Sequence, residues 1–241
     1  MKKIALWAIP RAVGTAFERA FVERDDTVVA HELFMPCHYY SAARASTRYD
    51  GIVDPAPEYE YQNVKRSVER LPAKPVLFLK EIAFHMRGIV QVDFWSSFTH
   101  TFIVRDPRVS IPSLYQLMPD FSFDETGFPA IKEMFELATG TYRQPPIVVN
   151  GDAFRRNPSE TLRAYCELVG IPFDDTTTWK TGKVLPEWEQ WPDWHREALT
   201  SSGIFEPPAQ RPSDDLPVHV KDMMAAALPY YTAVNRHAIS V

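Results

Sequence analysis

The sequence predicts an α/β fold with a central parallel sheet, helices on both faces of the sheet and a helical extension at the C-terminus. Apolar runs alternate along the chain with segments of helical periodicity, which is the order of elements in βαβ units. The apolar runs lack alternating polar residues, which is typical of strands covered on both faces. With 45% hydrophobic and 24% charged residues, the composition is that of an ordinary globular protein. We expect residues 1–241 to form one domain with a sizeable core.

Five apolar runs are expected to form the strands, with helices between them. The predicted strands are Lys3–Ala8, Thr27–His31, Pro75–Lys80, His100–Arg105 and Ile147–Asn150. The predicted helices are Thr15–Glu23, Glu58–Arg70, Pro107–Leu117, Ala130–Thr139 and Pro158–Val169. The last of these begins with a proline and is followed by Gly170, the residues that favour a helix start and a helix end.

Two regions do not fit the alternation, and both are rich in aromatic residues. Residues 33–57 contain three prolines, and residues 171–215 contain four tryptophans. Long loops in an α/β domain often line a site at the carboxyl ends of the strands, but packed surface excursions are equally compatible with these sequences. The aromatic residues that would wall a small apolar pocket, or belong to the core, are Phe34, Tyr39, Tyr40, Tyr49, Trp179, Trp188, Trp191 and Trp194.

Charge and cysteine content narrow the classes of function. The formal net charge is −5 and no run of Lys and Arg occurs, which argues against a nucleic-acid partner. Only two cysteines are present, Cys37 and Cys166, which fits a reducing cytosol. The apolar run Ile4–Ile9 is too short for a signal peptide, and no stretch approaches the ~20 apolar residues of a membrane span. We therefore expect a cytoplasmic protein without a membrane partner.

Residues 6–21, LWAIPRAVGTAFERAF, predict a strand, a tight turn and a helix. Backbone N–H groups at a helix N-terminus attract anions, and the helix dipole adds to that attraction. Gly14 would let the backbone approach a ligand closely, while Arg11 and Thr15 would add donors. No G-K-[ST] follows the glycine, so the segment is not a Walker A motif. Alone, it fits an anion site and an ordinary strand–turn–helix unit equally well.

Residues 100–117, HTFIVRDPRVSIPSLYQL, carry a second arrangement of this kind. Arg105 ends a predicted strand, and Ser113 lies two turns into the helix that follows. The fork of an arginine and the hydroxyl of a serine can bind one phosphate together. A salt-bridged arginine beside a solvent-facing serine is the alternative.

Together the two segments resemble the nucleotide signatures of the sulfotransferases that use 3′-phosphoadenosine 5′-phosphosulfate (PAPS). Pro10, Arg11 and Thr15 match the 5′-phosphosulfate loop of that family, and Arg105 and Ser113 match its 3′-phosphate motif. The stretch ETLRAYCELVGIPF is similar to a third family segment, so the resemblance covers residues 4–173. It implies the P-loop-like sulfotransferase fold and transfer of a sulfuryl group to a hydroxyl of a small acceptor.

The resemblance also implies which residues bind the donor. They are Arg11, Ala12, Val13, Gly14, Thr15 and Ala16 around the 5′-phosphosulfate, and Arg105 and Ser113 at the 3′-phosphate. Lys180 and Lys183 in WKTGKV resemble the family's C-terminal basic loop. Ala12 and Ala16 depart from the pattern, because the family usually has hydroxyl residues at these positions.

In such enzymes the basic residue of the first loop stabilises charge on the leaving 3′,5′-diphosphate (PAP), so Arg11 is expected to do so here. The segment PVLFLKEIAFHMRG is similar to the family's Leu-Lys-x-x-x-His pattern. Lys80 would touch the sulfuryl group or the acceptor. His85 is the first candidate for the general base and Glu81 the second. A histidine hydrogen-bonded to the backbone is the alternative reading of His85.

The co-substrate implied is PAPS, with PAP as product and no metal. The seven histidines are scattered and form no HExxH motif. The partner is a small-molecule hydroxyl acceptor, and a homodimer is possible. Two other functions stay open: a P-loop-fold kinase or phosphotransferase, and a catalytically degenerate nucleotide-binding module, which Ala12 and Ala16 motivate.

Overall fold

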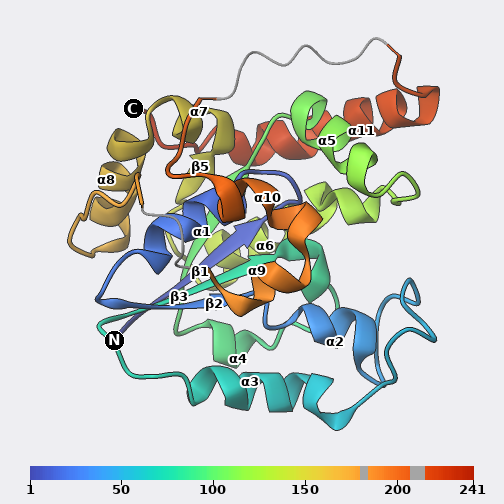
Figure 1. Ribbon diagram of the computed structural model, residues 1–241, viewed down its shortest axis with the longest axis horizontal. Helices are drawn as coiled ribbons and strands as arrows, with labels where there is room; N and C mark the ends of the chain where they lie inside the picture. Colours follow the sequence, from blue (N-terminus) through green and yellow to red (C-terminus); the bar gives the residue numbers. More distant parts are fainter. Residues whose placement is uncertain (180–183, 207–214) are drawn as a thin grey trace.

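The computed structural model describes residues 1–179, 184–206 and 215–241. Five strands form one parallel sheet in the order β2-β3-β1-β4-β5 (Figure 1). The strands are β1 (Lys2–Ala8), β2 (Thr27–His31), β3 (Val76–Ile82), β4 (Thr99–Val104) and β5 (Val148–Asn150). The chain leaves β1 toward one edge of the sheet and leaves β4 toward the other. Ligands of α/β proteins bind at such a switch point, outside the carboxyl ends of the strands.

Helices cover both faces of the sheet, which confirms the predicted fold class. On one face lie α1 (Gly14–Val22) and α8 (Pro158–Val169); Phe21 stacks on Phe78 of β3 with ring centroids 3.8 Å apart. On the other face lie α4 (Val92–Trp95) and α6 (Phe128–Glu136), and the rings of Trp7 and Trp95 are 4.9 Å apart. The register of β1 and β3 places Lys80 on the α1 face and Glu81 on the opposite face.

The remaining helices surround this core. They are α2 (Met35–Tyr40), α3 (Tyr61–Glu69), α5 (Pro107–Leu117), α7 (Gly151–Arg156), α9 (Pro186–Gln190), α10 (Pro192–Thr200) and α11 (Val218–Asn235). Short 3₁₀ turns occupy Pro57–Tyr59, Ala83–Met86 and Asp124–Thr126, and a π-helical turn occupies Leu137–Thr141. The C-terminal α11, red in Figure 1, packs against α5 and α6 and is the predicted helical extension. Among the described residues, no helix combines the length and apolarity needed to cross a membrane.

The strands lie where the apolar runs predict them, to within two residues at each end. The helices Pro107–Leu117 and Pro158–Val169 have the predicted bounds, because a proline starts each and the apolar spacing is regular. The predicted helix Glu58–Arg70 instead divides into a 3₁₀ turn and α3. The two regions expected to be loops contain short helices, α2 in the first and α9 and α10 in the second. Each of these three helices has a proline in its first turn.

Candidate active site

The turn between β1 and α1 has an unusual backbone. Arg11 and Val13 have φ angles of 61° and 70°, in the left-handed region that non-glycine residues seldom adopt. Gly151 of α7 supports the turn closely, because a Cβ added there would lie 2.5 Å from the carbonyl oxygen of Ala12. The turn leads directly into α1, whose first N–H groups have no acceptor within the helix. Such a backbone conformation is strained, and strain of this kind is concentrated at functional sites.

Arg11 lies partly buried at this turn and reaches across to two other elements. Its Nε donates to Ser113 Oγ of α5 at 2.9 Å, and its Nη1 donates to the carbonyl oxygen of Trp194 at 3.2 Å. Within the described residues, Arg11 makes no ion pair. Burial lowers the pKa of Arg11, against an opposing effect of Glu197. A partly buried guanidinium whose hydrogen bonds go only to neutral groups is a good partner for an anion.

Arg105 follows β4 at the same edge of the sheet. It is 9% exposed, and its Nε donates to Asp152 Oδ1 of α7 at 2.8 Å. Its positive charge contributes to the lowered pKa of Arg11, after burial. The structure therefore brings together Arg11 from the β1–α1 turn and Arg105 and Ser113 from the segment of β4 and α5.

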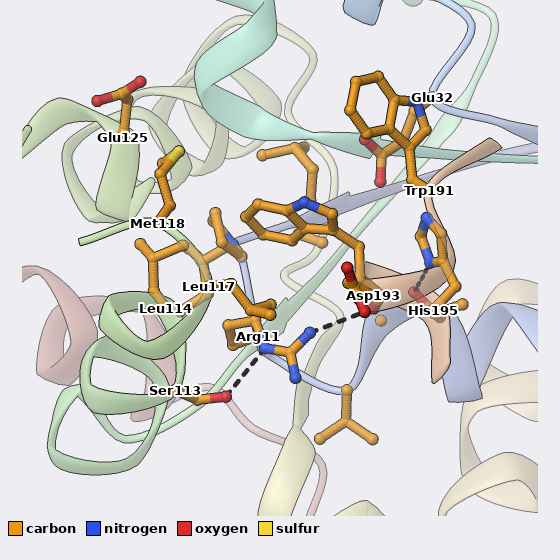
Figure 2. Close-up of a pocket in the computed structure, with 18 of the residues that line it drawn as sticks. Arg11, Glu32, Ser113, Leu114, Leu117, Met118, Glu125, Trp191, Asp193 and His195 are labelled. Atoms are coloured by element: carbon orange, nitrogen blue, oxygen red, sulfur yellow. Dashed lines mark hydrogen bonds between the residues drawn. The ribbon is translucent and has the colours of Figure 1, made fainter. Parts of the chain in front are cut away.

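A cavity of about 810 Å³ opens at the carboxyl ends of the strands, beside the β1–α1 turn (Figure 2). The predicted site residues that line it are Arg11, Val13, Gly14, Thr15, Ala16, Lys80, His85, Arg105 and Ser113. Ala12 and Glu81 are buried and do not line it. Lys180 and Lys183 lie outside the described residues.

Lys80 lines the cavity from β3, two residues before the strand ends. Its Nζ forms an ion pair with Glu32 Oε1. A Cβ added at Gly14 would lie 3.4 Å from Lys80 Cε, so the lysine stem packs against the first residue of α1. Gly14 thus gives Lys80 room to run beside the helix N-terminus.

His85 lines the cavity, and Glu81 lies on the far side of the sheet. Burial lowers the pKa of His85 to about 3, so its imidazole is neutral at neutral pH. Its Nδ1 is 3.9 Å from Glu32 Oε2 and has no hydrogen-bond partner among the described residues. Glu81 Oε1 accepts the backbone N–H of Phe34 at 3.1 Å, and burial raises the pKa of Glu81. This position gives Glu81 no direct access to a ligand in the cavity.

Three cavity residues that the sequence reasoning missed are Glu32, His31 and His195. His31 is the last residue of β2 and Glu32 follows it, so both lie at the same edge of the sheet as Arg11. Their position after a predicted strand is a signal that the sequence did contain. His195 had no such signal, because it belongs to α10. Its Nδ1 lies 3.3 Å from Thr15 Oγ1, and burial lowers the pKa of His195 to about 3.

The opposite end of the cavity is apolar. Figure 2 shows Leu114 and Leu117 of α5 and Met118, which follows it, on the side away from Glu32 and Trp191, with Glu125 beyond Met118. Of the predicted wall residues, those that line the cavity are Tyr39, Tyr49, Trp191 and Trp194. Those buried elsewhere are Phe34, Tyr40, Trp179 and Trp188. The cavity therefore joins a cationic end that suits an anion to an apolar end that suits an uncharged organic group. Among the described residues, no group of three or more His, Cys, Asp or Glu could hold a metal ion.

The chain is similar over nearly its whole length to known proteins. Branched-chain-amino-acid aminotransferase-like protein 2 of Arabidopsis thaliana is 27% identical in an alignment of 241 residues that covers 98% of this chain and 42% of that protein. Branched-chain-amino-acid aminotransferase-like protein 1 of the same organism is 25% identical in an alignment of 234 residues that covers 96% of this chain and 41% of that protein. The chain thus spans about two fifths of the length of these curated relatives.

Among solved structures, a sulfotransferase from Alicyclobacillus acidocaldarius shares the fold, with a TM-score of 0.55 and 8% identity. The alignment covers 98% of this chain and 96% of that one. The model of the family described as "Sulfotransferase domain" matches residues 1–238. The chain therefore belongs to the sulfotransferase domain family.

Proposed function

We propose that the protein transfers a sulfuryl group from PAPS to a hydroxyl of a small acceptor. The observation that carries this proposal is Arg11, which lies partly buried near Arg105 and the N-terminus of α1 and makes no ion pair with a carboxylate among the described residues. A donor with phosphate groups at both ends of its ribose would supply negative charge to both arginines.

The donor would bind across the carboxyl ends of β1 and β4. The first N–H groups of α1, together with Thr15, would hold the 5′-phosphosulfate. Arg105 and Ser113 would hold the 3′-phosphate. Arg11 would lie nearest the bridging oxygen, where charge develops as the bond to sulfur breaks, and its fixed guanidinium would stabilise that charge.

The acceptor would enter from the apolar end of the cavity. Leu114, Leu117 and Met118 would contact an apolar or aromatic body, which places its hydroxyl toward Lys80 and the loop after β1. Binding the two substrates in one cavity makes the transfer an effectively unimolecular step, which accounts for a large share of catalysis in such enzymes.

A second candidate is a module that binds the nucleotide without transferring sulfate. Ala12 and Ala16 favour it, because they remove two hydroxyl donors that the family usually places at the phosphosulfate. A phosphotransferase that uses ATP is less favoured, since the turn lacks the Walker lysine.

The test is a thermal-shift titration with PAP beside AMP and magnesium–ATP. A ligand that binds only the folded protein raises Tm, and micromolar affinity is sufficient for a clear shift. We expect a shift with PAP that Arg105→Ala abolishes and Arg66→Ala, on the exposed surface of α3, retains. A shift with ATP alone would exclude the proposal. If PAP binds, transfer of labelled sulfate to a panel of phenols and alcohols separates the enzyme from the binding module.

A further inference from the structure

Glu32 lines the cavity and has an unusual backbone conformation. It is a non-glycine residue with a positive φ, 45°, and its backbone N–H donates to the carbonyl oxygen of Lys80 at 2.8 Å. Four non-glycine residues in the described part of the chain have a positive φ, and three of them, Arg11, Val13 and Glu32, line this cavity. The fold therefore holds Glu32 in a conformation that has an energetic cost and directs its carboxylate to the same space as the proposed donor site.

The carboxylate of Glu32 has one strong partner, Lys80, and two histidines nearby. Oε1 pairs with Lys80 Nζ and lies 3.6 Å from His31 Nε2, and Oε2 lies 3.9 Å from His85 Nδ1. Burial alone would raise the pKa of Glu32, and Lys80 provides the largest of the effects that outweigh burial and lower it. While the ion pair is intact, the carboxylate is a weak base.

The ammonium of Lys80 has a second possible partner, an anion bound at the N-terminus of α1. Its stem packs against Gly14, the first residue of α1, so the ammonium lies within a side-chain rotation of the helix N-terminus. A phosphosulfate bound there would compete with Glu32 for the same ammonium. The two anions would lie on opposite sides of one lysine.

We propose that donor binding draws Lys80 away from Glu32, and that the freed, buried Glu32 carboxylate then accepts the proton of the acceptor hydroxyl. This inference rests on the proposed function. In the transfer, the acceptor oxygen forms a bond to sulfur while the bond between sulfur and the bridging oxygen breaks. The electron pair of that bond stays on the 5′-phosphate of PAP, and the hydroxyl proton moves to Glu32.

This exchange of partners by Lys80 would make donor binding precede proton transfer to Glu32. Before the donor binds, the ion pair keeps Glu32 from acting as a base. After it binds, burial without Lys80 makes the carboxylate a stronger base, since desolvation disfavours its charged form. The titratable groups that face or act on Glu32 from the elements around it are Lys80, His31, His85, His195, Tyr39 and Glu81. His85, the first candidate from the sequence, would then help to position Glu32 and would not take the proton itself.

The first experiment measures proton uptake when PAP binds, by calorimetry in buffers of different ionisation enthalpy over about pH 5–7. The wild-type protein should take up more protons per PAP than Glu32→Gln, because Glu32 gains basicity when Lys80 leaves. Lys80→Gln should also lose the extra uptake, since Glu32 then has no lysine to lose. The matched control is Glu136→Gln, which breaks a carboxylate–lysine pair with Lys132 on the exterior and should behave as wild type.

The outcomes separate the two proposals. If wild-type protein does not bind PAP, the proposed function fails. If PAP binds and Glu32→Gln takes up as many protons as wild type, the exchange is wrong while the donor site stands. Should Glu32→Gln fail to fold, Lys80→Gln gives the same comparison.

The second experiment measures transfer with donor saturating, using the acceptor that the transfer assay identifies or water as the acceptor. Glu32→Gln should lower the rate ~10²–10⁴-fold, the usual contribution of general base catalysis, and should remove the acid limb of the pH–rate profile. Glu32→Asp should keep that limb. If the pH–rate profile loses its acid limb in His85→Asn but keeps it in Glu32→Gln, the assignment of Glu32 as the general base is wrong.

Discussion

We expect the chemistry of this protein to depend on a few charged residues at the cavity. Arg11 has a left-handed backbone, is partly buried and relies on a hydroxyl and a carbonyl for its hydrogen bonds. Lys80 and Glu32 form an ion pair at the edge of the same cavity. A buried cation without a counter-ion lowers stability, and a bound anion recovers the loss.

Replacement of Arg11 should therefore affect stability and activity in opposite directions. Arg11→Ala removes a partly buried charge that makes no ion pair among the described residues, so we expect the free energy of unfolding of the unliganded protein to stay within about 1 kcal/mol of wild type or to rise. The PAPS-dependent rate should fall on the order of 10²–10³-fold, because the charge on the leaving phosphate loses its partner. Urea unfolding and sulfate transfer measured on one preparation test both parts. A large loss of stability would show that Arg11 is structural.

Helices affect the candidate site through how closely they pack against the turn after β1. Gly151 begins α7, and its missing side chain is what lets the turn lie against that helix. Gly140 offers a contrast, because a Cβ there would meet nothing within 4 Å. The position of the turn is set by packing between segments about 140 residues apart.

The corresponding prediction compares Gly151→Ala with Gly140→Ala. The first should displace the Ala12 carbonyl, destabilise the fold by roughly 1–3 kcal/mol and weaken PAP binding. The second should leave PAP affinity unchanged and stability equal or slightly higher. Chemical denaturation and PAP titration of both variants give the comparison. Equal PAP affinity in Gly151→Ala and wild type would contradict the role given to α7.

At this scale the sequence predicted the strands and two of the helices well. Pro107–Leu117 and Pro158–Val169 carry their own start signals and regular apolar spacing, so local information defines them. The short helices α2, α9 and α10 were not predicted, because five to nine residues rich in proline and aromatic side chains show no clear periodicity. They are stabilised by packing over the cavity rather than by helix propensity.

In the whole molecule, four buried histidines have lowered pKa values, which makes the stability of the fold depend on pH. Burial lowers the pKa of His38 and His100 to about 4 and of His85 and His195 to about 3. In the unfolded chain these groups bind protons below about pH 6.5. The folded protein does not bind them until much lower pH, so acid favours unfolding. Glu81 acts in the opposite direction, because burial raises its pKa in the folded state.

We therefore expect the free energy of unfolding to fall between about pH 6.5 and 5, with each buried histidine contributing up to about 1.4 kcal/mol per pH unit. Urea denaturation across this range measures the slope. His100→Gln should remove the contribution of close to one proton from the slope of the free energy of unfolding against pH. The variant also loses the hydrogen bond from Trp7 Nε1. The exposed His219 is the control, and His219→Gln should leave the slope unchanged. A flat profile in the wild type would contradict the prediction.

The sequence by itself determined the α/β fold and the segments that bear Arg11, Arg105 and Ser113, because apolar runs, prolines and short motifs are local features of the chain. Only the tertiary structure decided that His195 shares a cavity with these residues, and that Glu81 faces the other side of the sheet. The physical reason is distance along the chain. Parallel strands bring their carboxyl ends to one edge, and α10 reaches Arg11 and Thr15 across about 180 residues, through contacts that no local pattern records.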